Sequence, residues 1–241
     1  MYKKVILITG ASSGIGAGIA RELAASGAIL LLGARRVERL KTLATELRFR
    51  GAEVDIHELD VTCRESMQAF AQRALTTWGR IDVMINNAGV MPLSPMASLK
   101  VDEWERMVDV NIKGVLYGIA SVLPFMLECK AGHIINIGSI GALNVSPTAA
   151  VYCATKYAVR AISDGLRQEN NQLRVTCVHP GAVESELADT ITDQTAAEAM
   201  KSFRAIALQP DAIARAVRYV IEQPEDVDVN EIVVRSTRAA H

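Results

Sequence analysis

A tyrosine and a lysine at helical spacing are the residues most able to do chemistry in this sequence. Tyr152 and Lys156 stand four positions apart, which places the phenol and the ammonium on one face of a helix. A phenol with a pKa of ~10 is a poor base at neutral pH, but a cation at ~4 Å in an effective dielectric of ~20 favours the phenolate by ~4 kcal/mol. Tyr152 could thus exchange protons near neutral pH. A snorkelling surface pair is the ordinary alternative, and Ser139 upstream argues against it.

The stretch around these residues carries no ionised side chain. From Ala131 to Thr155 there is no Asp, Glu, Lys or Arg, although 22% of the chain is charged. Polar residues such as Asn136 and Asn144 make the stretch too polar for a membrane span. Lys156 therefore acts on Tyr152 with few competing charges in the sequence.

A glycine-rich loop near the start predicts a phosphate-binding site. The run TGASSGIG, residues 9–16, follows an apolar strand and opens a helix. Gly10, Gly14 and Gly16 let the backbone turn tightly and approach a pyrophosphate, and the helix N-terminus adds unpaired N–H groups and a favourable dipole. The loop is completed by Ser12, Ser13 and Ile15. Its spacing is G-x-x-x-G-x-G rather than the usual G-x-G-x-x-G.

The same loop also matches the G-x-S-x-G nucleophile elbow of hydrolases. In that alternative Ser12 is a nucleophile, and His179, which follows a later strand, could serve as its base. An elbow on the first strand, however, leaves no preceding strand to carry the oxyanion loop. A serine hydrolase therefore stays an alternative to a nucleotide-dependent enzyme.

Two arginines after the second predicted strand point to the kind of nucleotide. Ala34 stands where NAD-binding folds place an acid for the ribose, and Arg35 and Arg36 follow it. Cations just before a helix N-terminus oppose its dipole by ~0.3–1 kcal/mol each, so an anion is expected to compensate. A 2′-phosphate would do so, which predicts NADP(H). The alternative, solvated surface arginines near Glu38, suits Arg36 better than Arg35.

Polar residues end two further predicted strands. Asp60, followed by Val61, could accept a hydrogen bond from an adenine amino group, or it could be a carboxylate near the next helix N-terminus. Asn87, Ala88 and Gly89 form a turn whose amide and small side chains suit a close approach to ribose and ring. A purely structural turn has the same composition, so both interpretations stay open.

An alternating pattern of strands and helices must position these residues. Short Val- and Ile-rich runs alternate with segments of helical period, which predicts a single doubly wound α/β domain over residues 1–241, with a parallel sheet of about seven strands and helices on both faces. The strands are expected at Val5–Thr9, Ala28–Ala34, Val54–Leu59, Val83–Asn86, His133–Ile137, Arg174–Val178 and Glu231–Val234. Residues 184–204, an Ala-rich helical insertion where a short loop is usual, are the candidate substrate lid.

Taken together, these motifs resemble the short-chain dehydrogenase/reductase family over nearly the full length. The matching positions are Thr9 to Gly16, Asn86 to Gly89, Asn111, Ser139, Tyr152, Lys156, Pro180 and Gly181. The resemblance implies a Rossmann-type enzyme that moves a hydride between NADP(H) and a small alcohol or carbonyl substrate. Tyr152 would be the general acid or base, and Ser139 would hydrogen-bond the substrate oxygen. Lys156 would lower the pKa of Tyr152 and bind the nicotinamide ribose.

The resemblance implies further roles. Asn111 would hold a water relay to Lys156, although a helix-interior asparagine at a kink is its other interpretation. The nicotinamide-contacting turn would consist of Pro180, Gly181, Val183 and Ser185. Within the family the chain is similar to bacterial NADP-dependent reductases of 3-hydroxy acids or small aldehydes. A homotetramer or homodimer packed through helices at residues 101–127 and 148–170 is expected.

Composition excludes several other classes of protein. A net charge of −1 provides no field to attract nucleic acid or a membrane surface. The four cysteines are far apart and indicate neither a metal site nor a redox pair, which together with the lack of an export signal at the start predicts a cytoplasmic enzyme that needs no metal. Residues 114–127 are expected to be a buried core helix rather than a membrane span. A non-catalytic NADP(H)-binding regulator is the last alternative, and the Ser139, Tyr152 and Lys156 set argues against it.

Overall fold

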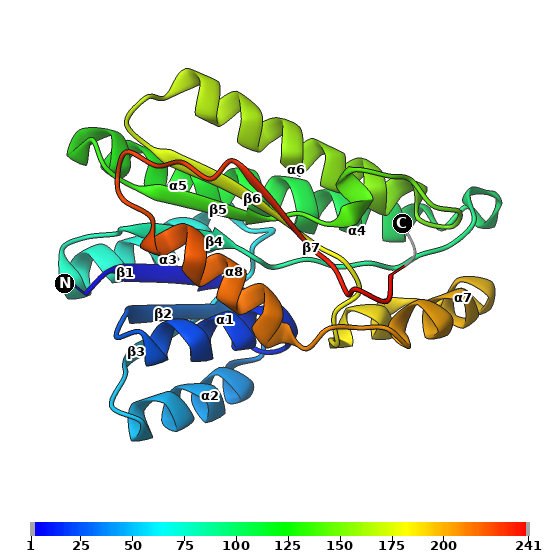
Figure 1. The fold of residues 1–241 in the computed structure, drawn as a ribbon, viewed down its shortest axis with the longest axis horizontal. Helices are drawn as coiled ribbons and strands as arrows, with labels where there is room; N and C mark the ends of the chain where they lie inside the picture. Colours follow the sequence, from blue (N-terminus) through cyan, green and yellow to red (C-terminus); the bar gives the residue numbers. More distant parts are fainter. Residues whose placement is uncertain (1–2, 240–241) are drawn as a thin grey trace.

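The Val- and Ile-rich runs form one parallel sheet, as the sequence predicts (Figure 1). In the computed structural model, which describes residues 3–239, the strands pair in the order β3-β2-β1-β4-β5-β6-β7. Their bounds are β1 Val5–Thr9, β2 Ile29–Ala34, β3 Glu53–Glu58, β4 Val83–Asn86, β5 His133–Ile137, β6 Arg174–Pro180 and β7 Glu231–Val234. β1 is buried along its whole length, as a strand covered on both faces must be. The predicted doubly wound α/β fold is confirmed.

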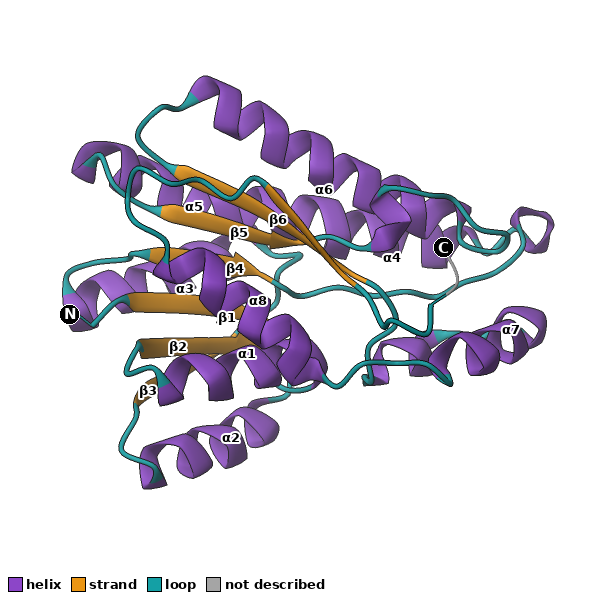
Figure 2. Cartoon of the chain, in the orientation of Figure 1, coloured by secondary structure: helices purple, strands orange, loops and turns teal. Residues whose placement is uncertain are grey.

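Alternate residues of β1 enter two separate hydrophobic clusters. Val5 and Leu7 pack with helices α3 (Arg64–Trp78), α4 (Val101–Val108), α5 (Gly114–Cys129) and α6 (Ala150–Glu169). Ile6 and Ile8 pack with α1 (Gly14–Ala25), α2 (Val37–Phe49) and α8 (Pro210–Glu222). Successive side chains of a strand point to opposite faces. The two clusters are therefore two helical layers, one on each face of the sheet (Figure 2).

The strand order reverses beside β1. The chain runs outward from β1 to β2 and β3, and then crosses back to place β4 on the other side of β1. In open parallel sheets, ligands bind outside the carboxyl ends of the strands at such a switch point. The glycine loop follows β1, and the turns after β4, β5 and β6 leave the same edge of the sheet. This topology gathers the candidate residues at one edge.

Residues 184–204 lie beyond that edge. After β6 the chain forms a short 3-10 helix, η4 (Glu186–Thr190), and then α7 (Gln194–Arg204), which lies past the ends of the strand arrows in Figure 1. Ala196 of α7 is 1% exposed, and Met200 packs against the cluster that contains α5 and α6. The insertion is thus anchored to the domain, while its role as a lid stays a prediction.

The long helix expected over residues 101–127 is interrupted. α4 ends at Val108, a π-helical turn η2 (Asp109–Lys113) follows, and α5 begins at Gly114. Such π turns insert an extra residue into a helix and are frequent at functional sites. The candidate Asn111 lies inside this turn.

The continuous helical stretch Val101–Cys129 is long and apolar enough to cross a membrane by length and composition. Within the fold, 44% of its most apolar window is buried, and Val115, Ile119 and Val122 belong to the cluster beside the sheet. Burial on one face is what a core helix of this kind requires. Met1, at the start for which no export signal is expected, lies outside the described residues.

Candidate active site

Ser139, Tyr152 and Lys156 converge at the carboxyl end of β5. Ser139 follows β5, and its Oγ accepts a hydrogen bond from the Gly141 N–H at 3.0 Å at the start of the 3-10 helix η3 (Ile140–Ala142). Tyr152 and Lys156 lie near the start of α6, and all three side chains are buried. Lys156 Nζ is 5.8 Å from the centroid of the Tyr152 ring and donates to the Ile137 carbonyl at 2.9 Å. The predicted grouping is therefore present in the structure.

Burial controls the protonation of this group. It raises the pKa of Tyr152 to about 12, although the hydroxyl of Ser139 acts in the opposite direction through a hydrogen bond. Burial also lowers the pKa of Lys156 to about 8. The expected stabilisation of the phenolate by Lys156 is not realised in this geometry, because the ammonium lies against the ring and its hydrogen bond goes to a carbonyl. Tyr152 consequently holds its proton at neutral pH and is set up to donate it.

Asn111 connects the π turn to α6 and to the segment that follows β4. Its Oδ1 accepts from the Val90 N–H at 2.9 Å, and its Nδ2 donates to the Val90 carbonyl at 3.0 Å and to Thr155 Oγ1 at 3.1 Å. A Cβ placed on Gly89 would lie 3.4 Å from Asn111 Oδ1 and 3.8 Å from Lys156 Nζ. The amide of Asn111 is thus used to hold the segment after β4 against α6, next to the lysine. The water relay expected of Asn111 stays a prediction.

The glycine loop has the open backbone that a pyrophosphate needs. Gly10 and Gly14 have φ values of +66° and +53°, which side-chain-bearing residues rarely adopt. α1 begins at Gly14 without a side-chain cap on its N-terminus. A Cβ on Gly16 would lie 2.5 Å from Gly10 O, so no larger residue fits there. These features fit a nucleotide phosphate at the α1 N-terminus.

The turn after β4 is hydrogen-bonded to the glycine loop. Asn87 Nδ2 donates to the carbonyls of Thr9 and Gly10 at 2.9 and 3.2 Å, and Thr9 Oγ1 accepts from the N–H groups of Asn87 and Ala88. A Cβ on Gly10 would lie 2.8 Å from the Ala88 Cα, so the two turns are in close contact. Both donors of the Asn87 amide point to the protein itself, which favours the structural interpretation of this residue.

Arg36 lies beside the glycine loop. Arg36 donates to Ser12 Oγ at 3.1 Å and to Ser13 Oγ at 2.6 Å, and it forms an ion pair with Glu186 at 2.5 Å. Arg36 is exposed, as the surface interpretation expects, but its side chain contacts Ser12, Ser13 and Glu186. The side chain of Glu38 pairs with Lys41 instead, and the guanidinium of Arg36 is held over the glycine loop. The contribution of Glu186 was missed, because no local pattern links residues so far apart.

Arg35 lines a nearby depression of about 340 Å³, whose other lining residues are Asp60, Thr62, Asp102, Glu105, Arg106, Asp109 and Val110. Asp60 Oδ1 accepts from the Thr62 N–H at 3.0 Å and from Thr62 Oγ1 at 2.8 Å, and these bonds lower the pKa of Asp60. Asp60 is thus an ionised acceptor on the wall of the depression. Val61 is buried, and its Cγ2 would lie 3.0 Å from a Cβ placed on Gly114, so it packs against α5.

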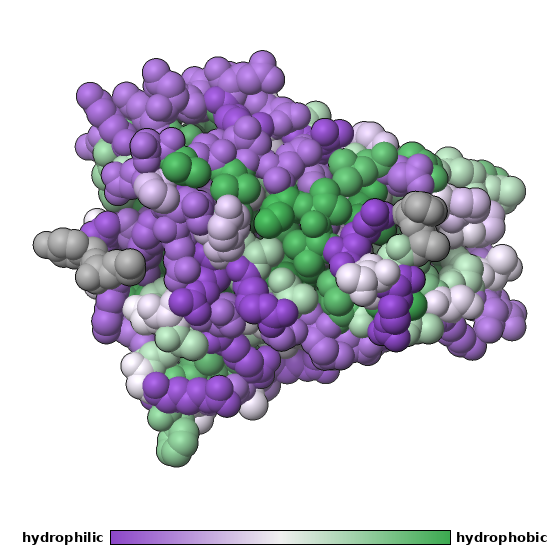
Figure 3. Space-filling model, in the orientation of Figure 1, coloured by the Kyte–Doolittle hydropathy of each residue, from purple (hydrophilic) through white to green (hydrophobic). Residues whose placement is uncertain are grey.

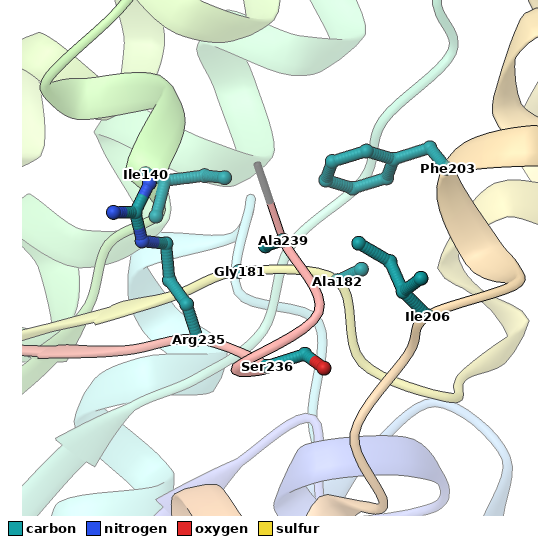
Figure 4. Close-up of a pocket in the computed structure, with 8 residues that line it drawn as sticks. All are labelled: Ile140, Gly181, Ala182, Phe203, Ile206, Arg235, Ser236 and Ala239. Atoms are coloured by element: carbon teal, nitrogen blue, oxygen red, sulfur yellow. The ribbon is translucent and has the colours of Figure 1, made fainter. Parts of the chain in front are cut away.

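The turn after β6 borders a small apolar cavity of about 90 Å³. Its lining residues come from η3, this turn, α7 with the segment that follows it, and the segment after β7. They are Ile140, Gly181, Ala182, Phe203, Ile206, Arg235, Ser236 and Ala239 (Figure 4). Pro180 ends β6, and Val183 forms an isolated bridge with Leu208. Ser185 caps η4, and its Cβ lies 3.0 Å from the Cβ position of Gly14. The turn therefore connects the glycine loop to the 184–204 insertion.

No histidine within residues 3–239 is placed to act as the base of a hydrolase centre on Ser12. The described histidines have other contacts, which are Phe70 for His57, Thr176 for His133 and the Ser139 carbonyl for His179. Ser12 Oγ meets Arg36, a group that cannot accept its proton. The geometry therefore opposes the serine hydrolase alternative.

Comparison with known proteins agrees with this geometry. An uncharacterized oxidoreductase of Staphylococcus saprophyticus is 49% identical over 236 residues, which cover 96% of this chain and 95% of that protein. The structure of an alcohol dehydrogenase from the archaeon Thermococcus sibiricus, complexed with 5-hydroxy-NADP, superposes with a TM-score of 0.90 at 34% identity over 99% of both chains. A closed form of serine dehydrogenase complexed with NADP⁺ superposes with a TM-score of 0.91 at 33% identity, over 98% of this chain and 96% of that one.

A family model described as short chain dehydrogenase matches residues 4–196. That match covers the glycine loop, the Ser139, Tyr152 and Lys156 group and the turn after β6. The chain is an oxidoreductase that belongs to the short-chain dehydrogenase family.

Proposed function

We propose that the protein is an NADP(H)-dependent alcohol dehydrogenase or carbonyl reductase with Tyr152 as its general acid and base. The observation that carries the proposal is the convergence of a protonated Tyr152, Ser139 and Lys156 at the sheet edge that also bears the glycine loop. The nicotinamide, when bound, supplies or accepts the hydride. In the reducing direction Ser139 holds the substrate oxygen, and Tyr152 donates its phenolic proton to that oxygen as the carbonyl carbon receives the hydride. In the oxidising direction the phenolate form of Tyr152 would accept the proton of the alcohol hydroxyl as the carbinol carbon gives up its hydride.

Preference for the 2′-phosphate is supported by the positive charge at the glycine loop. Arg36 lies across Ser12 and Ser13 and carries this argument, because the depression beside Arg35 also holds Arg106 and the acids Asp60, Asp102, Glu105 and Asp109. A fork-shaped guanidinium is suited to a phosphate, and the two serine hydroxyls add further donors. Both structural neighbours named above are complexes with NADP-type nucleotides.

The substrate is proposed to be a small ketone, aldehyde or hydroxy acid. The cavity at the turn after β6 holds about 90 Å³ and is lined largely by apolar side chains, which include Phe203 and Ile140, the residue that follows Ser139. The 184–204 insertion closes one side of it through α7, so we propose that the insertion acts as a substrate lid.

The decisive variant is Tyr152→Phe. It should abolish oxidation of alcohols and reduction of aldehydes while leaving NADPH binding intact, measured as nucleotide absorbance and as NADPH fluorescence enhancement. Normal turnover in this variant would remove Tyr152 from the mechanism. A wild-type protein that binds NADPH but converts no member of a broad panel of alcohols, aldehydes and hydroxy acids would support a non-catalytic nucleotide-binding regulator instead.

We also propose a cytoplasmic location. All four cysteines are free, and Cys153 and Cys177 are buried, which suits a reducing compartment. Cell fractionation followed by immunodetection tests this, and recovery of the protein in an oxidising compartment would contradict it.

A further inference from the structure

The arginine expected to meet the 2′-phosphate already holds an anion from the chain itself. Arg36 Nη1 lies 2.5 Å from Glu186 Oε2, and Arg39 bonds the other oxygen of the same carboxylate. The remaining nitrogens of Arg36, Nε and Nη2, donate to Ser12 and Ser13 of the glycine loop. All three nitrogens of this guanidinium are therefore engaged. Glu186 lies 150 residues further along the chain, at the start of η4 in the lid.

The contact is one that a stronger anion could replace. Hydrogen bonds from Arg39 and Arg36 hold the pKa of Glu186 at about 2, so the carboxylate stays charged throughout the physiological range. The side chains of Glu186, Arg36 and Arg39 are 42%, 46% and 50% exposed. Exposed ion pairs contribute little to stability. A phosphate monoester carries a charge of about −1.5 to −2 and three acceptor oxygens, so it outcompetes a single carboxylate for the same guanidinium.

The lid has a second attachment, near the start of α4. Lys100 and Thr192 are hydrogen-bonded, and Thr192 Oγ1 donates to Glu103 Oε1 at 2.6 Å, next to α4. Asp193 accepts from Ser98 Oγ at 3.3 Å in the same region. The insertion is thus held to α4 at its middle and to α2 through Glu186. Loss of the Glu186 contact would release η4 from α2, while the attachment to α4 remains.

We propose that Glu186 is an internal counter-anion for the 2′-phosphate site, which NADP(H) must displace from Arg36 and which thereby couples the phosphate to the position of the lid. The inference rests on the proposed preference for NADP(H). A nucleotide without the 2′-phosphate has nothing to exchange for the carboxylate and leaves the lid attached to α2. Glu186 then becomes a specificity-determining residue that lies outside the glycine loop and outside the arginine pair.

Nucleotide titration tests the competition. Glu186→Gln removes the competing charge but keeps the size of the side chain, so it should bind NADPH about fivefold tighter and NADH with unchanged affinity. Fluorescence titration of the apo protein with each reduced nucleotide measures both constants. Glu184→Gln is the matched control, because Glu184 lies in the same segment and pairs with Arg204 rather than Arg36. The control should leave both constants unchanged. Weaker NADPH binding by Glu186→Gln, or an equal change for both nucleotides, would overturn the proposal.

Amide hydrogen exchange tests, without enzyme turnover, whether binding of a 2′-phosphate changes the attachment of the lid. Adenosine 2′-monophosphate should accelerate amide exchange across residues 186–190 of the wild type, and adenosine 5′-monophosphate should not. In Glu186→Gln this segment should exchange fast without any ligand. Slower or unchanged exchange with the 2′-phosphate would contradict the displacement. If the wild type binds NADH as tightly as NADPH, the NADP(H) proposal itself fails; if it prefers NADPH but Glu186→Gln behaves as wild type, only the counter-anion role fails.

Discussion

At the scale of single residues, the two buried ionisable groups of the site respond to pH in different ranges. The pKa of Tyr152 is raised to about 12 and that of Lys156 is lowered to about 8, in both cases chiefly by burial. As the pH rises, the amine therefore loses its charge well before the phenol loses its proton. The proton that Tyr152 donates during reduction is present throughout, so the charge of Lys156 is what changes in the mildly alkaline range.

This difference predicts the alkaline limb of the reduction profile. The kcat/KM for aldehyde reduction should fall as the pH rises through about 8, because the Lys156 cation beside the Tyr152 ring is lost. Lys156→Arg keeps a cation at alkaline pH, so its profile should be lower in rate but without a fall in this range. A wild-type profile that stays level up to about pH 10 would show that the ammonium is not required.

The same burial predicts a stability effect. The folded state lowers the pKa of Lys156 from 10.5 to about 8, which costs about 3 kcal/mol at neutral pH. Lys156→Met removes this cost and also the bond to the Ile137 carbonyl, worth about 1 kcal/mol, so the variant should be about 2 kcal/mol more stable. Above about pH 8 the unfolded wild type binds more protons than the folded one.

The free energy of unfolding of the wild type should therefore rise toward pH 10.5. The difference in stability between Lys156→Met and the wild type should disappear over the same range. Urea unfolding at neutral pH and at pH values above 8 measures both differences. A stability difference between the two proteins that does not change with pH would show that the buried Lys156 amine is not its cause.

At the scale of elements, the close packing of α5 on β4 depends on one glycine. A Cβ on Gly118 would lie 2.0 Å from Asn86 Oδ1, and Asn86 begins a buried chain of hydrogen bonds through Asn136 to Ser163 in α6. This chain holds β4, β5 and α6 together behind the site. α5 can approach β4 only because position 118 has no side chain.

Gly118→Ala should consequently destabilise the fold by about 1–3 kcal/mol, because Asn86 must move and the chain of hydrogen bonds is broken. Gly165→Ala is the matched control, since nothing lies within 4 Å of its Cβ position in α6. That variant should be more stable than the wild type by about 0.5–1 kcal/mol, because alanine is the better helix former. Thermal or urea unfolding compares the two, and equal effects of both substitutions would refute the packing argument.

At the scale of the whole molecule, the surface retains apolar side chains on the helices expected to form an assembly. Leu116 and Leu127 of α5 are 43% and 41% exposed, and Tyr157 of α6 is 40% exposed. In the view of Figure 3, other apolar residues gather between the helices of the two layers. Exposed apolar groups on neighbouring helices favour contact with a second copy of the chain.

Light scattering should therefore find a homotetramer or homodimer. Leu116→Arg should shift the protein toward smaller species, because it buries a charge in the contact. Phe49→Arg is the control, since Phe49 is 93% exposed on α2, away from these helices. A wild-type protein that is monomeric at micromolar concentration would contradict the expected assembly.

Much of the fold could be predicted because its signals are local. Four expected strands, Val5–Thr9, Val83–Asn86, His133–Ile137 and Glu231–Val234, have the bounds found in the structure. Runs of apolar residues mark strands that are buried on both faces, and residues after such strands lie at one edge of a parallel sheet. For the same reason the sequence alone placed Ser139, Tyr152 and Lys156 together.

Three features of the site depend on tertiary contacts that no local sequence pattern contains. The π turn at Asp109–Lys113 comes from the packing of Asn111 between Val90 and Thr155. The protonation of Tyr152 depends on burial, which raises its pKa to about 12, and not on the cation four positions away. The link from Arg36 to Glu186 joins residues 150 positions apart. The sequence by itself thus determined which groups do the chemistry, and the folded structure decided their charge and their partners, because desolvation and long-range contacts exist only once the chain is packed.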